Sequence, residues 1–358
     1  MFKKIARDIL IAFGLMALTL STSRTAMKYT SDKRDNNYWW GTYQCLNGDL
    51  VSMSYLDIVS RFNQPNPRGG FKHPSFNGQR KMVLYMDGDS FTWHLCDSDF
   101  AGLESFCYFQ RNHGLKYHLD TTKKNVLVIE VSERYLQSYF TGFQMFNEVI
   151  DTTIKAKKIS TLPVRADAGI CYSSMLPSIS VNSLFNKNIN QNLQFNLFNY
   201  NFMMPMFESK AALNYYFFNR ASGDVVISDD RKFLFLKETI SKTDIGSSYH
   251  PVSPADASTI VDVLNGIYDH YKAAGFAEVY FSVIPNSATI MQPDGYNNLI
   301  PMVQNNPRLR MKIIDIYTTF KHSKEIYYLP GDTHWNHKGK QLWLDLLNKH
   351  LLTDTSGR

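Results

Sequence analysis

The sequence predicts an α/β fold in which helices cover both faces of a parallel sheet, and three observations favour this class. Apolar runs bounded by polar turns occur at 81–86, 125–131, 278–284 and 311–316, and continuous apolar runs are typical of parallel strands buried on both faces. A capped segment with helical spacing of apolar residues follows Ser253, and another closes the chain. Strands that alternate with helices pack as a three-layer arrangement with the sheet in the middle.

Composition places the chain among globular proteins and excludes several other classes. Its 358 residues are 44% hydrophobic and 20% charged, which rules out wholesale disorder. With 19 glycines and no sustained heptad, the chain is neither collagen-like nor a coiled coil. About half of the net charge of +6 lies within residues 1–26. The other Lys and Arg residues form no basic stripe interleaved with aromatics, so no nucleic-acid partner is expected.

The first 26 residues predict an export signal. Lys3, Lys4 and Arg7 precede an apolar stretch over 9–20, and small residues suited to cleavage follow at 21–26. A cleaved signal peptide is the first choice, because the apolar stretch is shorter than the ~20 residues of a membrane span. A retained N-terminal anchor with a cytosolic N-terminus is the rival. Either alternative exports residues 27–358 to the periplasm or cell envelope.

Four cysteines fit an oxidising compartment without requiring disulfides. Cys45, Cys96, Cys107 and Cys171 allow three complete pairings. We rank the Cys96–Cys107 pairing first, because these two lie close enough in sequence to close a short loop. Buried free thiols are the alternative. The chain has no Cys-x-x-Cys, no zinc-type Cys/His spacing and no His-Glu-x-x-His, so neither a metal nor another cofactor is predicted.

The strands and the long middle segment divide the first two thirds of the chain. The run at 81–86 feeds the turn Asp-Gly-Asp-Ser at 87–90, and the run at 125–131 feeds Ser-Glu-Arg at 132–134. Residues 151–230 are rich in Asn, Ser, Phe and Met without a strong period. We interpret them as an insertion with some helix. The Met and Phe cluster at 202–207 favours core packing over a pocket for an acyl chain.

The last third returns to regular alternation. Ser253, Pro254 and Asp256 predict a helix start, and Gly275 predicts its end. Strands are expected at 278–284 and 311–316, with a short helix at 296–304 between them. A polar loop over 331–336 then opens the final helix, which carries an apolar stripe of Leu342, Trp343, Leu346, Leu347 and Leu351.

Three residues at the predicted strand ends and loops could form a catalytic triad. Parallel sheets place their ligands at the carboxyl ends of strands, where Ser90 would stand in its turn. A serine hydroxyl needs a base to take its proton. Among ten histidines, His334 stands at the mouth of a helix, two residues after Asp332. Asp332 could orient one imidazole nitrogen while the other faces Ser90. Taken singly, each could instead be a turn serine or a helix-capping Asp beside a surface His.

These residues resemble a known family. Gly-Asp-Ser-Phe at 88–91 and Asp-Thr-His-Trp-Asn at 332–336 resemble the SGNH (GDSL-type) hydrolase superfamily. The Asp-x-His-Trp variant is closer to its alginate O-acetyltransferase-like branch, which acetylates exopolysaccharides. Segments 128–134 and 281–290 are also similar to that branch. The resemblance covers most of 80–135 and 230–350 but not the Asn-rich middle, and it implies an SGNH/flavodoxin-like domain.

The sequence departs from that branch in two ways. The serine block comes before the Asp-x-His-Trp block, as in ordinary SGNH hydrolases, whereas the alginate enzymes have the opposite order. The Gly and Gly-x-Asn-Asp blocks of ordinary members are not evident in the sequence. Oxyanion donors beyond the backbone of Ser90 are therefore unassigned.

The resemblance implies a role for each candidate residue. Ser90 would be the nucleophile, His334 the general base and acid, and Asp332 the orienting carboxylate, with Gly88 and Asp89 at the oxyanion or cleft. Asp89 could instead stabilise the turn through its side chain.

Two further residues are candidates for substrate binding. Arg134 could bind a sugar carboxylate or hydroxyls, or it could pair with Glu130 or Glu133. Trp335 could stack on a pyranose ring, or it could anchor the last helix in the core.

The function expected from this constellation is serine-dependent acyl transfer. The resemblance implies an O-acetyltransferase acting on a cell-envelope or extracellular polysaccharide through an acyl-serine, with a membrane-bound O-acyltransferase as acetyl donor. An acetylesterase with the same triad is an alternative, because water could replace the sugar as acceptor. A glycan-binding protein on the same scaffold without catalysis is the other.

Overall fold

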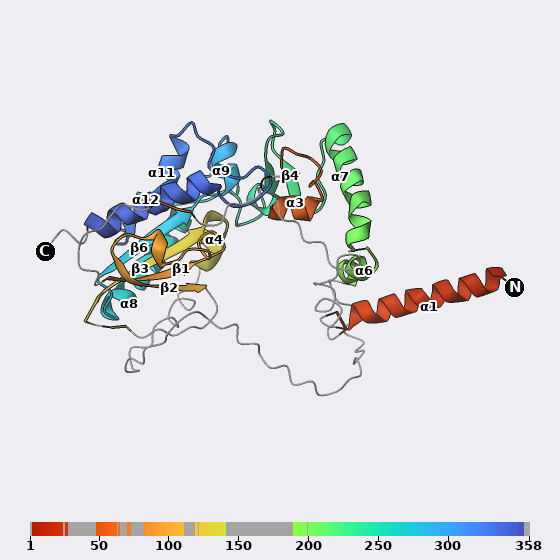
Figure 1. Ribbon diagram of the computed structural model, residues 1–358. Helices are drawn as coiled ribbons and strands as arrows, with labels where there is room; N and C mark the ends of the chain where they lie inside the picture. Colours follow the sequence, from red (N-terminus) through yellow and green to blue (C-terminus); the bar gives the residue numbers. More distant parts are fainter. Residues whose placement is uncertain are drawn as a thin grey trace. The chain divides into compact units, whose positions relative to one another are not determined.

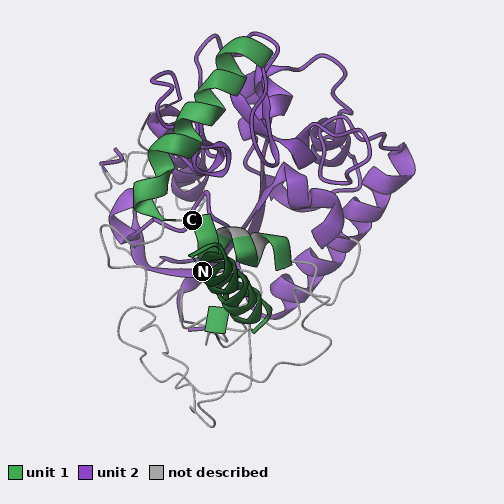
Figure 2. Cartoon of the chain, turned by 90° about the vertical axis from the view of Figure 1, so that its right-hand side faces the viewer, with its two compact units in different colours: residues 1–46, 159–218 green, residues 47–158, 219–358 purple. Residues whose placement is uncertain are grey.

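The computed structural model describes residues 2–23, 26–27, 48–62, 64, 70–72, 82–110, 119–120, 122–140, 189–198 and 200–353. The chain divides into two compact units (Figure 2): unit 1 comprises residues 1–46 and 159–218, and unit 2 comprises residues 47–158 and 219–358. Most of the predicted insertion therefore belongs to the same unit as the N-terminal segment.

Unit 2 contains a five-stranded parallel sheet, which confirms the predicted α/β class (Figure 1). The strand order is β2 (Leu103–Gln110), β1 (Met82–Gly88), β3 (Lys124–Ser132), β6 (Glu278–Ile284) and β7 (Lys312–Ile313). Every neighbouring pair runs parallel. The chain steps from β1 to β2 on one side and then returns to β3 on the other, so the strand order switches direction between β1 and β3.

Side chains alternate between two hydrophobic cores, one on each face of the sheet. Val83, Leu127 and Phe281 pack with the buried stripe of α8 (Pro254–Ala273). Leu84 and Val128, one residue further along their strands, pack with α12 (His337–Thr353). This two-residue alternation on strands buried along both faces explains why their sequences are continuously apolar.

The remaining described elements of unit 2 are short. They are α3 (Asp49–Ser54), η1 (Asp97–Asp99), α4 (Glu133–Tyr139), β4 (Val225–Ile227), β5 (Leu234–Leu236), η4 (Lys237–Thr239), α9 (Ser287–Met291), α10 (Leu299–Gln304) and α11 (Ile316–Lys321). The pair β4–β5 forms a separate antiparallel sheet.

Unit 1 contributes three described helical elements and a 3-10 turn. They are α1 (Phe2–Thr22), α6 (Ile189–Phe198), η3 (Asn201–Met203) and α7 (Met204–Phe218). Among the described residues, α1 is the one helix long and apolar enough to cross a membrane. This finding fits either a signal sequence or an anchor.

In the cluster at 202–207, Met204 is buried whereas Phe202 and Met206 are exposed, so the expectation of core packing is wrong for these two.

The predicted strand at 311–316 is much shorter than expected. Pairing with β6 covers Lys312 and Ile313 alone. The Asp315 side chain accepts a hydrogen bond from the backbone N–H of Thr318 at 2.9 Å and starts α11. A local helix cap therefore ends the strand, although the apolar pattern continues into the helix.

The expected bond between Cys96 and Cys107 is not formed, and both are free thiols. Cys107 lies on β2 and packs against the core on the α8 face. Cys96 is exposed in the loop whose neighbour Leu95 belongs to the core on the opposite face. Cys96 Sγ instead contacts Ser98 Oγ at 3.1 Å and an Asp99 carboxylate oxygen at 3.5 Å. Cys45 and Cys171 lie outside the described residues.

Candidate active site

The turn that follows β1 holds Ser90 at the carboxyl edge of the sheet. The Asp89 carboxylate accepts hydrogen bonds from the backbone N–H of Phe91 at 2.9 Å and of Ser132 at 3.3 Å. The Tyr108 hydroxyl donates to the Asp89 carbonyl at 2.8 Å. Asp89 thus joins the end of β1 to the end of β3 and fixes the backbone around Ser90.

Gly88 is required by close packing behind that turn. A Cβ at this position would lie 2.2 Å from Thr92 Oγ1 and 3.2 Å from a Glu130 carboxylate oxygen. That oxygen accepts from the Asp89 N–H and the Thr92 hydroxyl, both at 3.0 Å. The placement of Gly88 and Asp89 at the oxyanion is therefore corrected: Gly88 is buried, and the Asp89 N–H and carboxylate are used by the scaffold.

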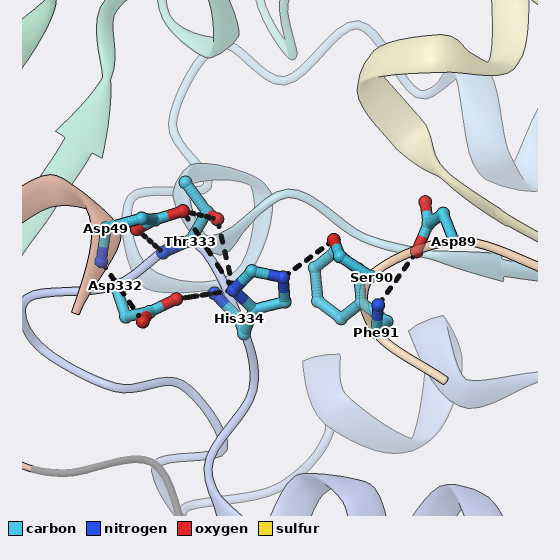
Figure 3. Close-up of polar contacts among 7 residues, drawn as sticks. All are labelled: Asp49, Asp89, Ser90, Phe91, Asp332, Thr333 and His334. Carbon is cyan, nitrogen blue, oxygen red and sulfur yellow. Dashed lines mark hydrogen bonds and ion pairs between the residues drawn. The ribbon is translucent and has the colours of Figure 1, made fainter. Parts of the chain in front are cut away.

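Ser90, His334 and Asp332 meet at this edge, as the sequence predicted (Figure 3). His334 Nε2 lies 2.7 Å from Ser90 Oγ, and His334 Nδ1 lies 2.5 Å from Asp332 Oδ1. The same Asp332 oxygen accepts the backbone N–H of His334 at 2.8 Å. A proton on Nδ1 therefore faces the carboxylate, and Nε2 is left to accept the Ser90 proton.

The electrostatic environment keeps this histidine basic. Burial by itself lowers the pKa of His334, but the hydrogen bond and charge of Asp332, together with the charge of Asp49, outweigh it and raise the pKa above its ordinary value. Burial likewise raises the pKa of Asp332, but the hydrogen bond and charge of His334 leave it below its usual range. The carboxylate is thus ionised beside the imidazole.

A second carboxylate, which the sequence analysis missed, stands behind the triad. Asp49, the first residue of α3, accepts the backbone N–H of Thr333 at 2.8 Å and also the Thr333 hydroxyl. Its own N–H donates to Asp332 at 3.3 Å, and its carboxylate lies 3.9 Å from His334 Nδ1. In Figure 3 both aspartates lie on the Nδ1 side of the imidazole, opposite Ser90.

No sequence signal marks Asp49, because it lies 283 residues before Asp332 in an unremarkable helix start. Burial and the neighbouring charge of Asp332 raise its pKa. The ligand atoms of Asp49, Asp332 and His334 lie within 4.8 Å of one another, a spacing that could hold a cation. Hydrogen bonds among these residues and Thr333 already account for the arrangement.

A small pocket borders the triad. Its volume is about 10 Å³, which is room for roughly one water molecule. Phe91 and Thr333, the chain neighbours of Ser90 and His334, form part of its wall. The complete lining is Phe91, Ser132, Arg134, Leu236, Thr239, Asn286, Ser287 and Thr333.

Two side chains of this pocket have buried polar atoms without a hydrogen-bond partner in the described part of the chain. They are Oγ of Ser132 and Nε of Arg134. Arg134 also lowers the pKa of His334, so its charge acts at the triad. Asn286 differs, because its amide donates to Gly246 and Ser248 and is satisfied by the scaffold. Ser132 and Arg134 are therefore the donors that the pocket leaves available.

The two residues predicted to bind substrate, Arg134 and Trp335, lie in different surroundings. Among the described residues, Arg134 forms no ion pair with Glu130 or Glu133; it lies over the Tyr135 ring at 4.9 Å and lines the pocket. Trp335 is only 2% exposed and packs edge-on against Phe91 and beside Trp343. The prediction that Trp335 binds substrate is wrong, because its ring anchors the last helix in the core.

The site lies where the topology of the sheet predicts one. Ser90 follows β1 and Ser132 ends β3, the two strands between which the strand order changes direction. At such a switch point the connections leave in opposite directions, which opens a crevice at the carboxyl edge.

No protein-family model, curated protein or solved structure matches this chain. Fold and site define an α/β protein with a serine–histidine–aspartate constellation at the edge of a parallel sheet.

Proposed function

We propose that this protein is an exported SGNH-type enzyme of acyl transfer, an O-acetyltransferase that modifies a cell-envelope or extracellular polysaccharide. The observation that carries the proposal is the hydrogen-bonded chain from Asp332 through His334 to Ser90, with contacts of 2.5 and 2.7 Å. Such a chain activates a hydroxyl for attack on an ester or a related acyl donor.

The first half-reaction forms an acyl-serine. Ser90 Oγ attacks the carbonyl carbon of the donor while His334 Nε2 takes the hydroxyl proton. The imidazolium is stabilised by Asp332 and by the nearby charge of Asp49. Collapse of the tetrahedral intermediate breaks the bond to the donor's leaving group, which receives the proton from His334. The acetyl group then remains on Ser90 as an ester.

The negative charge of the intermediate needs donors, and three groups at the site are available. The Ser90 N–H has no acceptor in the described part of the chain. The Ser132 hydroxyl and the Arg134 Nε–H line the adjoining pocket without partners. Donors that are already oriented stabilise a developing oxyanion without the cost of reorganisation. They replace, in this proposal, the Gly and Asn donors of ordinary SGNH members.

In the second half-reaction a sugar hydroxyl replaces the leaving group. His334 removes its proton, the oxygen attacks the acyl carbon, and the bond to Ser90 Oγ breaks as the serine regains a proton. The pocket beside the triad has room for roughly one water molecule, which argues against a long acyl chain in it. A membrane-bound O-acyltransferase as the source of the acetyl group belongs to this proposal through the family resemblance alone.

The test is hydrolysis of p-nitrophenyl acetate, with and without oligosaccharide acceptors, by wild type, Ser90→Ala and His334→Ala. The exposed His322 provides a matched control, His322→Ala. Both triad variants are expected to lose at least about 1000-fold in kcat/KM, with the control unchanged. A gain in acetylated sugar, measured by mass spectrometry, identifies a transferase. Hydrolysis without sugar acetylation identifies an esterase. Equal rates in all four proteins would remove the enzyme proposal.

A further inference from the structure

The end of α1 is packed into unit 1 rather than left accessible. Ser21, Thr22 and Ser23 are each no more than 3% exposed. Asn192 of α6 donates to the Ser21 carbonyl at 2.7 Å, and Asn196 donates to the Ser21 hydroxyl at 2.8 Å. Asn192 and Asn196 are four residues apart and therefore lie on one face of α6. The Asn-rich insertion thus supplies the partners for this end of the N-terminal helix.

This packing covers Ser21 to Ser23, three of the small residues at which a signal peptide would be cut, whereas Ala26 is half-buried. The Ser23 carbonyl and hydroxyl accept from the N–H groups of Met27 and Ala26, so the backbone is also held after the helix. Proteolysis needs an accessible and extendable segment. Removal of α1 would leave Asn192 without the Ser21 carbonyl and Asn196 without the Ser21 hydroxyl, although Asn196 would keep its contact with Met27 Sδ at 3.2 Å. The structure therefore favours retention of α1.

The other end of α1 is suited to a lipid environment. From Phe2 to Leu18 the large apolar side chains are exposed, among them Leu10 and Leu15. The uncharged part of α1, residues 9–20, spans about 18 Å. The long side chains of Lys3, Lys4 and Arg7 can carry their charges out to the headgroups, so that more of the 21 residues of the helix can lie within the ~30 Å hydrocarbon core. Lys3, Lys4 and Arg7 keep its N-terminus on the cytosolic side, so Ser21 and α6 stand at the outer surface.

The helix that comes after α6 in the chain, α7, carries an exposed apolar stripe. On α7, Met206, Leu213 and Phe217 are 58%, 51% and 79% exposed, and their spacing of seven and four places them along one side of the helix. Lys210 lies on the same side and is also exposed. An exposed row of large apolar side chains marks a surface that meets a membrane or another protein, and the long Lys210 side chain can carry its charge past that row to the headgroups.

Chain connectivity keeps α7 near that surface. Phe198 ends α6 and Met204 starts α7, so the two residues are at most about 20 Å apart. We propose that unit 1 is a membrane-contact module: α1 stays on the mature chain as its bilayer-spanning anchor, and the apolar stripe of α7 lies in the outer interface of the same bilayer. Lys210 would reach the lipid phosphates. The proposal does not depend on the chemistry at Ser90.

The test is hydroxyl-radical footprinting of the full chain in vesicles of phosphatidylcholine and phosphatidylglycerol, at no more than a single copy per vesicle. Met206 is more exposed than Met53 of unit 2, which is 41% exposed, so in water it should be oxidised faster. In the vesicles we expect Met206 to be oxidised at least about fivefold more slowly than Met53, because an interfacial helix buries its apolar side below the headgroups. The tryptic peptide 8–24 should be recovered from protein prepared from cell membranes.

A double substitution with a matched control sharpens the test. Leu213→Glu with Phe217→Glu should restore Met206 oxidation to at least the Met53 rate, whereas Ile326→Glu, an exposed apolar position of unit 2, should not. Met204 is 4% exposed, and its continued protection shows that α7 remains folded.

Several outcomes would overturn the proposal. Loss of peptide 8–24 would mean that α1 is cleaved. Rapid oxidation of Met206 in wild-type vesicles would mean that the stripe stays in water. Protection that appears only at many copies per vesicle would mean a contact between chains. Protection that appears only in membranes from producing cells would mean a protein partner.

Discussion

At the scale of single residues, the site depends on side chains that contact the two ring nitrogens of His334. Asp332 fixes the tautomer of the imidazole by binding Nδ1, and the Ser90 hydroxyl donates its hydrogen bond to the unprotonated Nε2. Asp49 adds a second negative charge and holds Thr333, the residue between Asp332 and His334. Asp49 is therefore a positioning residue, because it reaches the reacting atoms only through others.

Asp49→Asn should shift the pH dependence of activity. The neutral amide can still accept the Thr333 N–H, but it removes a charge that raises the pKa of His334. In the proposed reaction neutral His334 is the active base, so kcat/KM is expected to rise as pH increases through that pKa. The midpoint of this acidic limb, measured with p-nitrophenyl acetate, should move to lower pH.

The exposed Asp262→Asn serves as the control for that profile, and its midpoint should stay where the wild type has it. A lower rate for Asp49→Asn with an unmoved midpoint would show that Asp49 has a structural role alone.

At the scale of elements, local signals and tertiary context determine different boundaries. Ser253 starts α8 as predicted: its hydroxyl accepts the Asp256 N–H at 3.2 Å, and the Asp256 carboxylate accepts the Ser253 N–H at 2.8 Å. Both partners of this reciprocal cap lie within four consecutive residues, so the sequence is enough to predict it. The end of β7 was not predicted, because an apolar run continues across the Asp315 cap that divides it.

Ser253→Ala should destabilise unit 2 by about 1 kcal/mol, whereas Ser253→Gly should cost only a few tenths of a kcal/mol. The alanine removes the acceptor for Asp256, and glycine partly compensates by letting water reach the helix end. Denaturant unfolding followed by fluorescence of the buried Trp335 and Trp343 measures the difference. Equal stability of the wild type and the alanine variant would contradict a contribution of the cap.

At the scale of the whole of unit 2, a buried acid ties the strand ends together. Glu133, after β3, accepts the N–H of Asn286 at 2.8 Å and the hydroxyl of Thr289 at 2.5 Å, both beyond β6. Burial raises its pKa to about 7, although these hydrogen bonds and one with Tyr296 oppose the shift. Glu133 therefore supports the wall of the pocket that contains Asn286.

The raised pKa of Glu133 makes stability depend on pH. The folded state binds the proton more tightly than the unfolded state, so stability falls as pH rises from the ordinary glutamate pKa toward 7. Glu133→Gln keeps an acceptor oxygen without the charge. It should leave the free energy of unfolding unchanged near pH 4 and raise it at pH 8 by on the order of 3 kcal/mol.

The exposed Glu238→Gln is the matched control, and its effect should not differ between the two pH values. A Glu133→Gln variant that is equally stable relative to wild type at both values would contradict this account of the buried carboxyl.

Features that depend on neighbouring residues could be predicted from the sequence alone. Continuous apolar runs predicted β1, β3 and β6, the Ser253 cap predicted α8, and the strand-end positions of Ser90 and the Asp332–His334 pair predicted where they would meet. These features follow from backbone geometry, because the carboxyl ends of parallel strands share one edge.

Features that depend on contacts between distant segments could be established only from the folded chain. Asp49 stands behind the triad because α3 packs beside the 331–334 loop, and Trp335 is buried because Phe91 and Trp343 pack against it. Cys96 and Cys107 remain free thiols although a bond between them would close only a short loop, and Ser21 is covered because an insertion far along the chain supplies two asparagines. Burial and pairing are properties of which surfaces meet, and no local pattern of residues records that.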